Sequence, residues 1–450
     1  MAQETAGKAD HLCVLIHGLW GNPSHLSYLE TALREAYPAD RLHILLAKSN
    51  AYNHTYDGIH LGGERIASEI ESQIKTLSDS GTTIRKLSIV GYSLGGLVAR
   101  YTIGLLYATG LFDTIEPVNF TTFATPHLGV RTPLVGPHSY LWNVLGARTL
   151  STSGRQLFLI DTFRDTGKPL LAVLADSSSI FIRALQRFKH RSLYTNIIND
   201  RSAVYYTTSI SKTDPFVDLS AVELNPLPGY NGVLLDPEDP VKPKQLPQLS
   251  LLERLKVGSM TTLQSIPFIL LLGIAVPIGS VLFLLNSGLQ TFRSAQRVKL
   301  HESGKAGIGI EQYRIPLIEE ARAGIGRVYA GMAGDVGEEY LPTPSETDED
   351  DDGDDKPQDG VGTSTADLKG GDEAVTKRHR GHQGQFPTLA LTHEQFEMIE
   401  NLDAVGFTKY PVHIRKVRHS HAAIVVRSRW RPGFDEGKIV VGHWVQGFEL

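Results

Sequence analysis

Residues 86–101 place a short apolar run, a serine between glycines and a helix-compatible segment in immediate succession. The apolar run 87–90 favours a β-strand, and the segment that follows suits a helix. Ser93 stands between them in the pattern G-x-S-x-G, where glycines avoid the collisions that larger side chains would cause in a sharp turn. A strand, a turn and a helix in this order present a serine at the carboxyl end of a sheet. Ser93 is therefore a candidate nucleophile.

A second strand-like run near the start of the chain ends in a glycine turn. Residues 11–16 read H-L-C-V-L-I and lead directly into His17, Gly18 and Leu19. Sites of ester chemistry often place H-G-x after a strand, because glycine lets the main chain approach the reacting carbonyl. We expect the backbone N–H groups of Leu19 and Leu94 to form an oxyanion hole. An ordinary glycine turn is the alternative.

Strand-like and helix-like segments alternate along most of the chain. Helical spacing of apolar residues predicts helices over 27–37, 62–77 and 389–401, and β-rich runs predict further strands over 41–47, 118–124, 192–199 and 412–417. Such alternation is typical of a mostly parallel sheet covered by helices on both faces. The fold class that we predict is α/β.

The end of the predicted strand 192–199 delivers a candidate acid, Asp200. A carboxylate at this point can accept the N–H of a histidine, fix its tautomer and stabilise the imidazolium form. Other loop aspartates remain as alternatives, since aspartates in loops often cap helices or turns: Asp161, Asp214 and Asp218.

The candidate base follows the last predicted strand. His421 leads into the apolar segment A-A-I-V-V, which would anchor it, and the base commonly comes last in a chain of this order. His419 is a nearby alternative. His127, in the loop T-P-H-L-G after the strand 118–124, is another, although Pro126 and Gly129 mark a tight exit from that strand.

Composition limits the classes of protein and compartment that we consider. The single cysteine, Cys13, excludes an internal disulfide framework, and residues 1–10 lack the apolar run of a secretory signal. We expect a reducing, cytosol-facing location rather than secretion. The formal net charge of −5 includes eight acidic residues within 346–355, so the remainder carries +3. This small net charge lacks the strong positive excess that is typical of nucleic-acid-binding proteins.

The remaining segments suggest how the domain is interrupted. Residues 10–225 are expected to form the first part of the core, with a helical cap at about 131–190 whose large apolar residues either line an acyl-chain groove or complete the core. We expect a proline-rich linker or surface loop over 226–250, a connecting segment over 301–341, a disordered acidic insertion over 342–388 and the final part of the core over 389–450.

The segment 251–300 contains twenty residues without a charge, 266–285. A single crossing of a bilayer would separate Asp200 from His421, and Pro277 would break a helix near the middle of the run. Basic residues flank the run on both sides, as on cytosolic flanks. We therefore expect a membrane-associating apolar hairpin in one leaflet or a lipid monolayer. A buried helical pair is the alternative.

Ser93, Asp200 and His421 in this chain order, with H-G-x near the start, make the sequence similar to an α/β-hydrolase. The motifs H-G-L-W-G, G-Y-S-L-G-G-L-V-A-R-Y, T-P-H-L-G and N-I-I-N-D-R-S-A-V-Y-Y-T resemble the putative serine esterase family that includes fungal lipid-droplet phospholipases. The resemblance covers about 10–225 and 389–450. Ala203 departs from it, since similar proteins often carry proline there.

This resemblance implies hydrolysis of acyl esters of glycerophospholipids through an acyl-enzyme, at a lipid droplet or the cytosolic face of a membrane. It implies no metal or cofactor, and the sequence lacks H-E-x-x-H spacing and complete phosphate-loop or dinucleotide motifs. A lipase for neutral lipids, an acyl-protein thioesterase and a membrane-binding module without turnover remain alternatives.

Overall fold

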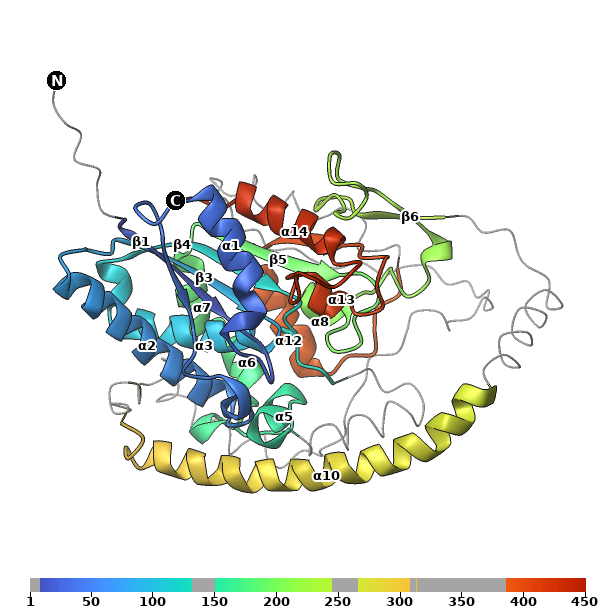
Figure 1. Cartoon of the computed structure of the whole chain (residues 1–450), viewed down its shortest axis with the longest axis horizontal. Helices are drawn as coiled ribbons and strands as arrows, with labels where there is room; N and C mark the ends of the chain where they lie inside the picture. Colours follow the sequence, from blue (N-terminus) through green and yellow to red (C-terminus); the bar gives the residue numbers. More distant parts are fainter. Residues whose placement is uncertain (1–8, 132–149, 245–265, 308–312, 314–385) are drawn as a thin grey trace, which may run out of the picture.

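The computed structural model describes residues 9–131, 150–244, 266–307, 313 and 386–450, and for 266–283 it describes the backbone. Its centre is a six-stranded parallel sheet in the order β2-β1-β3-β4-β5-β8 (Figure 1). The strands are β1 (His11–Ile16), β2 (His43–Leu46), β3 (Lys86–Tyr92), β4 (Glu116–Phe123), β5 (His190–Asn196) and β8 (Thr408–Val412).

Helices cover both faces of this sheet (Figure 1). One face packs against α2 (Ile59–Asp79), α3 (Leu94–Ala108), α7 (Ile180–Arg187) and α12 (His393–Asp403), and the other against α1 (Ser27–Ala36) and α14 (Asp435–Gln446). Side chains alternate along β1, so that Leu12 and Val14 enter one cluster and Cys13 and Leu15 the other. The predicted α/β fold with two covered faces is confirmed.

Short helices connect these elements. They are α5 (Ser151–Leu157), α6 (Leu170–Leu174), α8 (Tyr205–Thr208) and α13 (Ser420–Ala423), with 3-10 turns η1 (Pro23–Leu26), η2 (Tyr52–Tyr56), η3 (Leu111–Asp113), η4 (Arg164–Thr166) and η5 (Leu219–Ala221). The expected helical cap is not separate in the described residues. Leu157, Leu170 and Phe181 are buried in the same cluster as α3, because α7 packs directly on that helix. Residues 132–149, with Leu141 and Trp142, lie outside the described part.

The proline-rich segment is ordered rather than a linker over 226–244. Strand β6 (Val222–Leu224) pairs antiparallel with β7 (Val241–Pro243), and Leu234 forms a bridge to Val412 of β8. Val233 and Leu234 are fully buried against the main sheet. The prolines interrupt regular structure, but the apolar residues between them still pack.

The apolar segment forms one continuous helix, α10 (Ile266–Glu302), so the predicted hairpin is wrong. A proline removes one backbone hydrogen bond and bends a helix without necessarily reversing the chain, and Figure 1 shows α10 curved along its length. Among the residues whose side chains are described, the helices include none with the length and hydropathy of a membrane span. Most of the predicted segments 301–341 and 342–388 lies outside the described residues.

Candidate active site

Ser93 lies at a sharp turn between β3 and α3. Its backbone angles, φ 56° and ψ −128°, are rare for a residue with a side chain. Its N–H donates to the carbonyl oxygen of Phe123 at 2.9 Å, so β4 holds the turn. A Cβ at Gly95 would lie 2.2 Å from the carbonyl oxygen of Ile16, which explains the glycine. The turn therefore presents the Ser93 hydroxyl at the carboxyl edge of the sheet.

Three side chains predicted from the sequence meet at this edge. His421 Nε2 lies 2.9 Å from Ser93 Oγ, and His421 Nδ1 lies 2.8 Å from Asp200 Oδ2. The three residues follow β3, β5 and β8, and the carboxyl ends of these parallel strands lie at one edge. The arrangement forms a continuous hydrogen-bonded chain from a hydroxyl through an imidazole to a carboxylate.

Four donors hold the Asp200 carboxylate. Oδ1 accepts the backbone N–H groups of Ser202 at 3.0 Å and Ala203 at 2.9 Å, and Oδ2 accepts Asn196 Nδ2 at 3.0 Å beside the His421 contact. The side chain is 2% exposed. This carboxylate is therefore a fixed acceptor that orients His421. Ala203 contributes an N–H that a proline at this position would lack, so the alanine adds a hydrogen bond to the carboxylate.

His421 is positioned from its other sides as well. The ring centroid of Tyr92 lies 5.2 Å from that of His421, and the Tyr92 hydroxyl donates to the His421 carbonyl oxygen at 2.9 Å. Burial raises the pKa of Tyr92, which keeps its hydroxyl protonated as a donor. Ser420 Oγ donates to the carbonyl oxygen of Ile198 at 2.8 Å and ties the start of α13 to the loop of Asp200.

The two predicted oxyanion donors flank Ser93. A Cβ at Gly18 would lie 2.7 Å from Ser93 Cβ, so the loop before Leu19 packs closely against Ser93. Within the described part of the chain, neither the Leu19 nor the Leu94 N–H donates to a protein acceptor. The next residue, Trp20, donates its N–H to Thr55 Oγ1 at 3.1 Å, which anchors this loop to η2. Both amides are thus free to bind an oxygen.

Comparison with known proteins agrees with this geometry. Residues 6–213 match the family model described as "Putative serine esterase (DUF676)". This part of the chain, which contains Ser93 and Asp200, is similar to that family. "Putative lipase ROG1" of Saccharomyces cerevisiae is 36% identical over 212 residues, which are 46% of this chain and 29% of that protein. "Putative lipase C4A8.10" of Schizosaccharomyces pombe is 30% identical over 210 residues, 45% and 26% of the two chains.

The chain spans about a third or less of the length of the curated relatives that it matches. Among solved structures, a chain of phospholipase PlaB from Legionella pneumophila is similar with a TM-score of 0.27 and 14% identity, over 44% of this chain and 41% of that one. A lipase-esterase related protein from Clostridium acetobutylicum has a TM-score of 0.24 and 11% identity, over 45% and 80%. The sheet order and the Ser93 turn, rather than these scores, identify the α/β-hydrolase fold.

The alternative histidines occupy other environments. His127 is fully buried, with Nε2 3.0 Å from Thr122 Oγ1. Burial, followed by the charges of Arg100 and Lys409, holds the pKa of His127 well below its ordinary value. His419 is exposed and directly precedes α13. Of the three histidines, the structure brings His421 to Ser93.

The alternative aspartates cap local structure. Asp161 accepts the N–H of Leu170, Asp214 that of Phe216, and Asp218 that of Ser220. Burial raises the pKa of Asp161, and it raises that of Asp214 to about 6. Asp218 lies at the start of η5. These contacts are the ordinary roles of loop aspartates.

Two residues of the site escaped the sequence analysis, Tyr92 and Asn196. Tyr92 directly precedes Ser93, and Asn196 lies four residues before Asp200 in the run N-I-I-N-D. Sequence proximity to the candidate residues was the available signal for both. Among the described residues, no group of three or more histidine, cysteine or acidic side chains is placed to hold a metal ion.

Proposed function

We propose that this chain is a serine-dependent hydrolase that cleaves acyl esters of glycerophospholipids at a lipid surface. The observation that carries the proposal is the hydrogen-bonded chain Ser93–His421–Asp200. Asp200 accepts the Nδ1 proton of His421, so the Nε2 lone pair faces the Ser93 hydroxyl. As Ser93 Oγ attacks the acyl carbonyl, Nε2 takes the hydroxyl proton and later gives it to the departing alcohol.

The negative charge that develops on the carbonyl oxygen requires donors that are already in place. The N–H groups of Leu19 and Leu94 would supply them, and a preorganised donor of this kind is worth about 10²–10³ in kcat. Water then attacks the acyl-enzyme, with His421 again taking the proton, and releases a fatty acid. Ser93 regains its proton, so the cycle closes without a cofactor.

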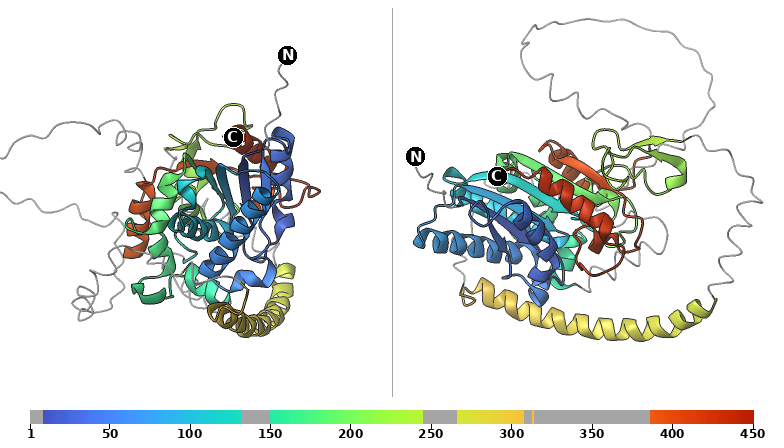
Figure 2. Two further views of the ribbon diagram at one scale, coloured as in Figure 1. Left: turned by 90° about the vertical axis from the view of Figure 1, so that its left-hand side faces the viewer. Right: turned by 45° about the horizontal axis from the view of Figure 1, so that its top comes forward.

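Helix α10 supports the proposed lipid surface because its polarity is reversed. On a helix that covers a soluble protein, apolar residues normally face inward. Here the inward positions are polar and buried: Ser287, Gln290, Ser294 and His301. The exposed positions include large apolar residues, between 46% and 67% exposed: Leu284, Leu285, Leu289, Phe292 and Leu300. An outward apolar stripe suits lipid, and Figure 2 shows α10 on the outside of the molecule.

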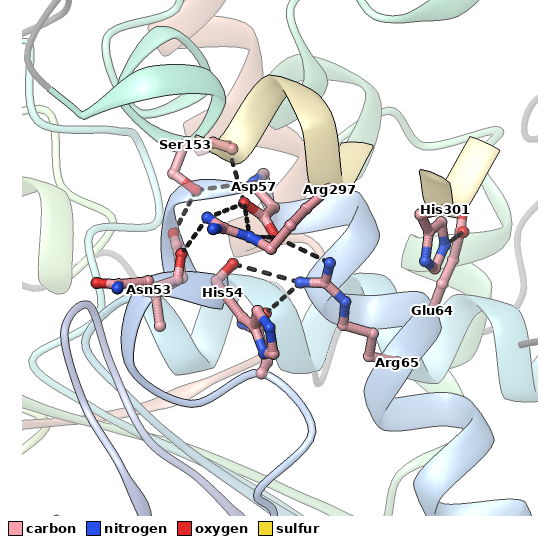
Figure 3. Close-up of polar contacts among 12 residues, drawn as sticks. Asn53, His54, Asp57, Glu64, Arg65, Ser153, Arg297 and His301 are labelled. Atoms are coloured by element: carbon pink, nitrogen blue, oxygen red, sulfur yellow. Dashed lines mark hydrogen bonds and ion pairs between the residues drawn. The ribbon is translucent and has the colours of Figure 1, made fainter. Parts of the chain in front are cut away.

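The polar face of α10 is fastened by buried charges (Figure 3). Asp57 is fully buried and accepts Arg297 Nη2 at 2.7 Å, Ser294 Oγ at 2.8 Å and Arg65 Nη2 at 2.8 Å. One turn further along α10, His301 Nε2 lies 2.7 Å from Glu64 Oε2. The contacts hold the helix with its apolar stripe turned away from the domain. Exposed Arg293 and Lys299 beside the stripe would favour an anionic surface.

The catalytic part is tested with purified Ser93→Ala and a control, Ser72→Ala, which changes an exposed serine on α2. Fatty acid release from phosphatidylcholine vesicles is measured for both. We expect a loss of at least about 10³-fold for Ser93→Ala and none for the control. Release at the wild-type rate by Ser93→Ala would refute the assignment.

The lipid surface is tested on the exposed stripe of α10. Leu289→Glu with Phe292→Glu should abolish flotation with vesicles, because charges on the lipid-facing side oppose insertion. The control, Asn286→Glu with Gln296→Glu, adds the same charge at exposed polar positions of the same helix. Equal flotation of the two double variants would exclude α10 as the contact.

A neutral-lipid lipase is the second candidate, because the yeast relatives are named putative lipases. The nucleophile and its partners do not separate the two substrates, because both reactions open an acyl ester. Turnover of phosphatidylcholine, triacylglycerol and an acyl thioester under one set of conditions separates them. Phospholipid turnover below that of triacylglycerol would replace the first candidate with the second.

A further inference from the structure

A cavity of about 630 Å³ opens beside His421, and its lining is strongly basic. Four arginines contribute, Arg201, Arg418, Arg427 and Arg431, and neither aspartate nor glutamate belongs to the lining. We name this cavity the arginine pocket. It is formed by the loop after Asp200 and the loops on either side of α13, so the elements that hold the catalytic side chains also shape it.

The positive charge of the arginine pocket is not neutralised by the described part of the chain. None of the four arginines forms an ion pair with a described carboxylate. The neighbouring acids are already engaged: Asp200 by its four donors, and Glu436 by Arg415. Burial and then the charge of Arg427 lower the pKa of His25 to about 4, so His25 is neutral at neutral pH.

Arginine matches a phosphate group better than other cationic side chains do. Its planar guanidinium presents parallel N–H donors to two oxygens at once and keeps its charge at any physiological pH. Ser202 and Ser428 also line the pocket and add hydroxyl donors. A cluster of this composition without a carboxylate is suited to an anion with several oxygens.

The position of the pocket relates it to the substrate. His421 lines the pocket and also contacts Ser93 Oγ at 2.9 Å, so a group in the pocket lies near the reacting acyl carbonyl. In a glycerophospholipid one glycerol carries both the phosphate and the acyl esters, and the sn-2 ester is on the carbon next to the phosphate. Trp430, 93% exposed between two arginines of the same loop, suits the interface of a lipid layer.

We propose that the arginine pocket binds the phosphate of the glycerophospholipid head group and favours head groups with net negative charge. This inference rests on the proposed function, since it names the part of the substrate that the pocket recognises. Removing two of the arginines should lower the preference for an acidic head group by about tenfold or more, because charge-assisted hydrogen bonds to phosphate are lost.

The test uses short-chain lipids as monomers, so that the charge of a vesicle surface plays no part. For each protein, kcat/KM is measured on dibutanoyl phosphatidic acid and on dibutanoylglycerol, and their ratio is compared. Arg201→Gln with Arg418→Gln should lower the ratio about tenfold. The control Arg41→Gln with Arg85→Gln removes the same charge from exposed sites before β2 and β3. It should leave the ratio of the two kcat/KM values unchanged. A folding defect would scale both rates by the same factor, so a change in the ratio reports the pocket rather than the folded fraction.

An unchanged ratio in the pocket variant would overturn the proposal. Glycerol 3-phosphate distinguishes the two sources of phosphate: competitive inhibition against phosphatidic acid supports a head-group site, whereas activation without competition indicates a free phosphate ligand and contradicts it. Calorimetry with Ser93→Ala protein measures the binding of dibutanoyl phosphatidic acid without turnover. If Ser93→Ala remained active, the catalytic assignment would fail, while weaker binding after the two arginine substitutions would still support the pocket.

Discussion

The substitution Asp200→Asn tests how the carboxylate controls His421. An asparagine keeps one oxygen and replaces the other with NH₂. The backbone N–H groups of Ser202 and Ala203 both point at the Oδ1 position, at 3.0 and 2.9 Å, so the remaining oxygen stays there. The NH₂ then occupies the Oδ2 position, 2.8 Å from His421 Nδ1.

Facing a donor, His421 must accept at Nδ1 and carry its proton on Nε2. That proton points toward Ser93 Oγ, 2.9 Å away, and the ring can no longer take the hydroxyl proton. Enforcing the wrong tautomer costs about 10⁴-fold in kcat in serine hydrolases with this arrangement. A loss of this size corresponds to about 5.5 kcal/mol of transition-state stabilisation.

The assay is the turnover of a soluble p-nitrophenyl ester by purified protein, with thermal unfolding as the check on folding. The control is Asp218→Asn, which changes an aspartate that caps η5. We expect wild-type kcat for the control and about 10³–10⁴-fold less for Asp200→Asn, with similar unfolding temperatures. A folded Asp200→Asn protein with more than about a tenth of wild-type kcat would refute this account of the tautomer.

Three further perturbations follow from individual contacts. Gly18→Ala places a Cβ 2.7 Å from Ser93 Cβ, so kcat/KM for a soluble ester should fall about 10²-fold; an unchanged value would show that the loop moves freely. Arg297→Met removes the positive charge that faces buried Asp57, which should lower the free energy of unfolding by up to about 3–5 kcal/mol. Limited proteolysis should then cut within α10 sooner than in wild type. Burial lowers the pKa of His60 to about 3, so His60 stays neutral when folded while the unfolded chain takes up a proton below about pH 6.5. The free energy of unfolding should therefore decrease by up to about 1.4 kcal/mol per pH unit from pH 6.5 towards 3, and His60→Gln should reduce that slope in urea titrations.

Much of the sheet could be predicted because its strands are short apolar runs that end at recognisable turn or loop residues. The last strand was misplaced: the prediction was 412–417, whereas β8 is Thr408–Val412. Pro411 lies inside β8, and proline ordinarily argues against a strand. The sheet order explains the exception, since β8 is an edge strand and one of its sides needs no ladder of N–H donors.

The candidate site was accessible from the sequence because each residue type has a recognisable local setting. Ser93 lies between glycines, and Asp200 and His421 follow strands. The choice of His421 over His419 depends on the short helix α13, which no sequence pattern marked. The catalytic roles of Ser93, Asp200 and His421 stay predictions that the assays above test.

The interruptions of the domain were harder to predict because an apolar or proline-rich run does not specify its partner. Leu234 packs beside Val412, which is far away in the sequence. This contact orders a segment that we expected to be a linker. Pro277 suggested a hairpin, but one lost hydrogen bond did not end α10. The polar face of α10 depends on Asp57, which lies 240 residues before Arg297.

The most direct test of the central claim is the reactivity of Ser93 toward a fluorophosphonate probe, located by peptide mass spectrometry. We predict that the folded wild-type protein is modified at Ser93 and that His421→Ala reduces the labelling rate by at least about 10²-fold, because the imidazole no longer takes the proton. Labelling at another serine, or an equal rate without His421, would contradict the account.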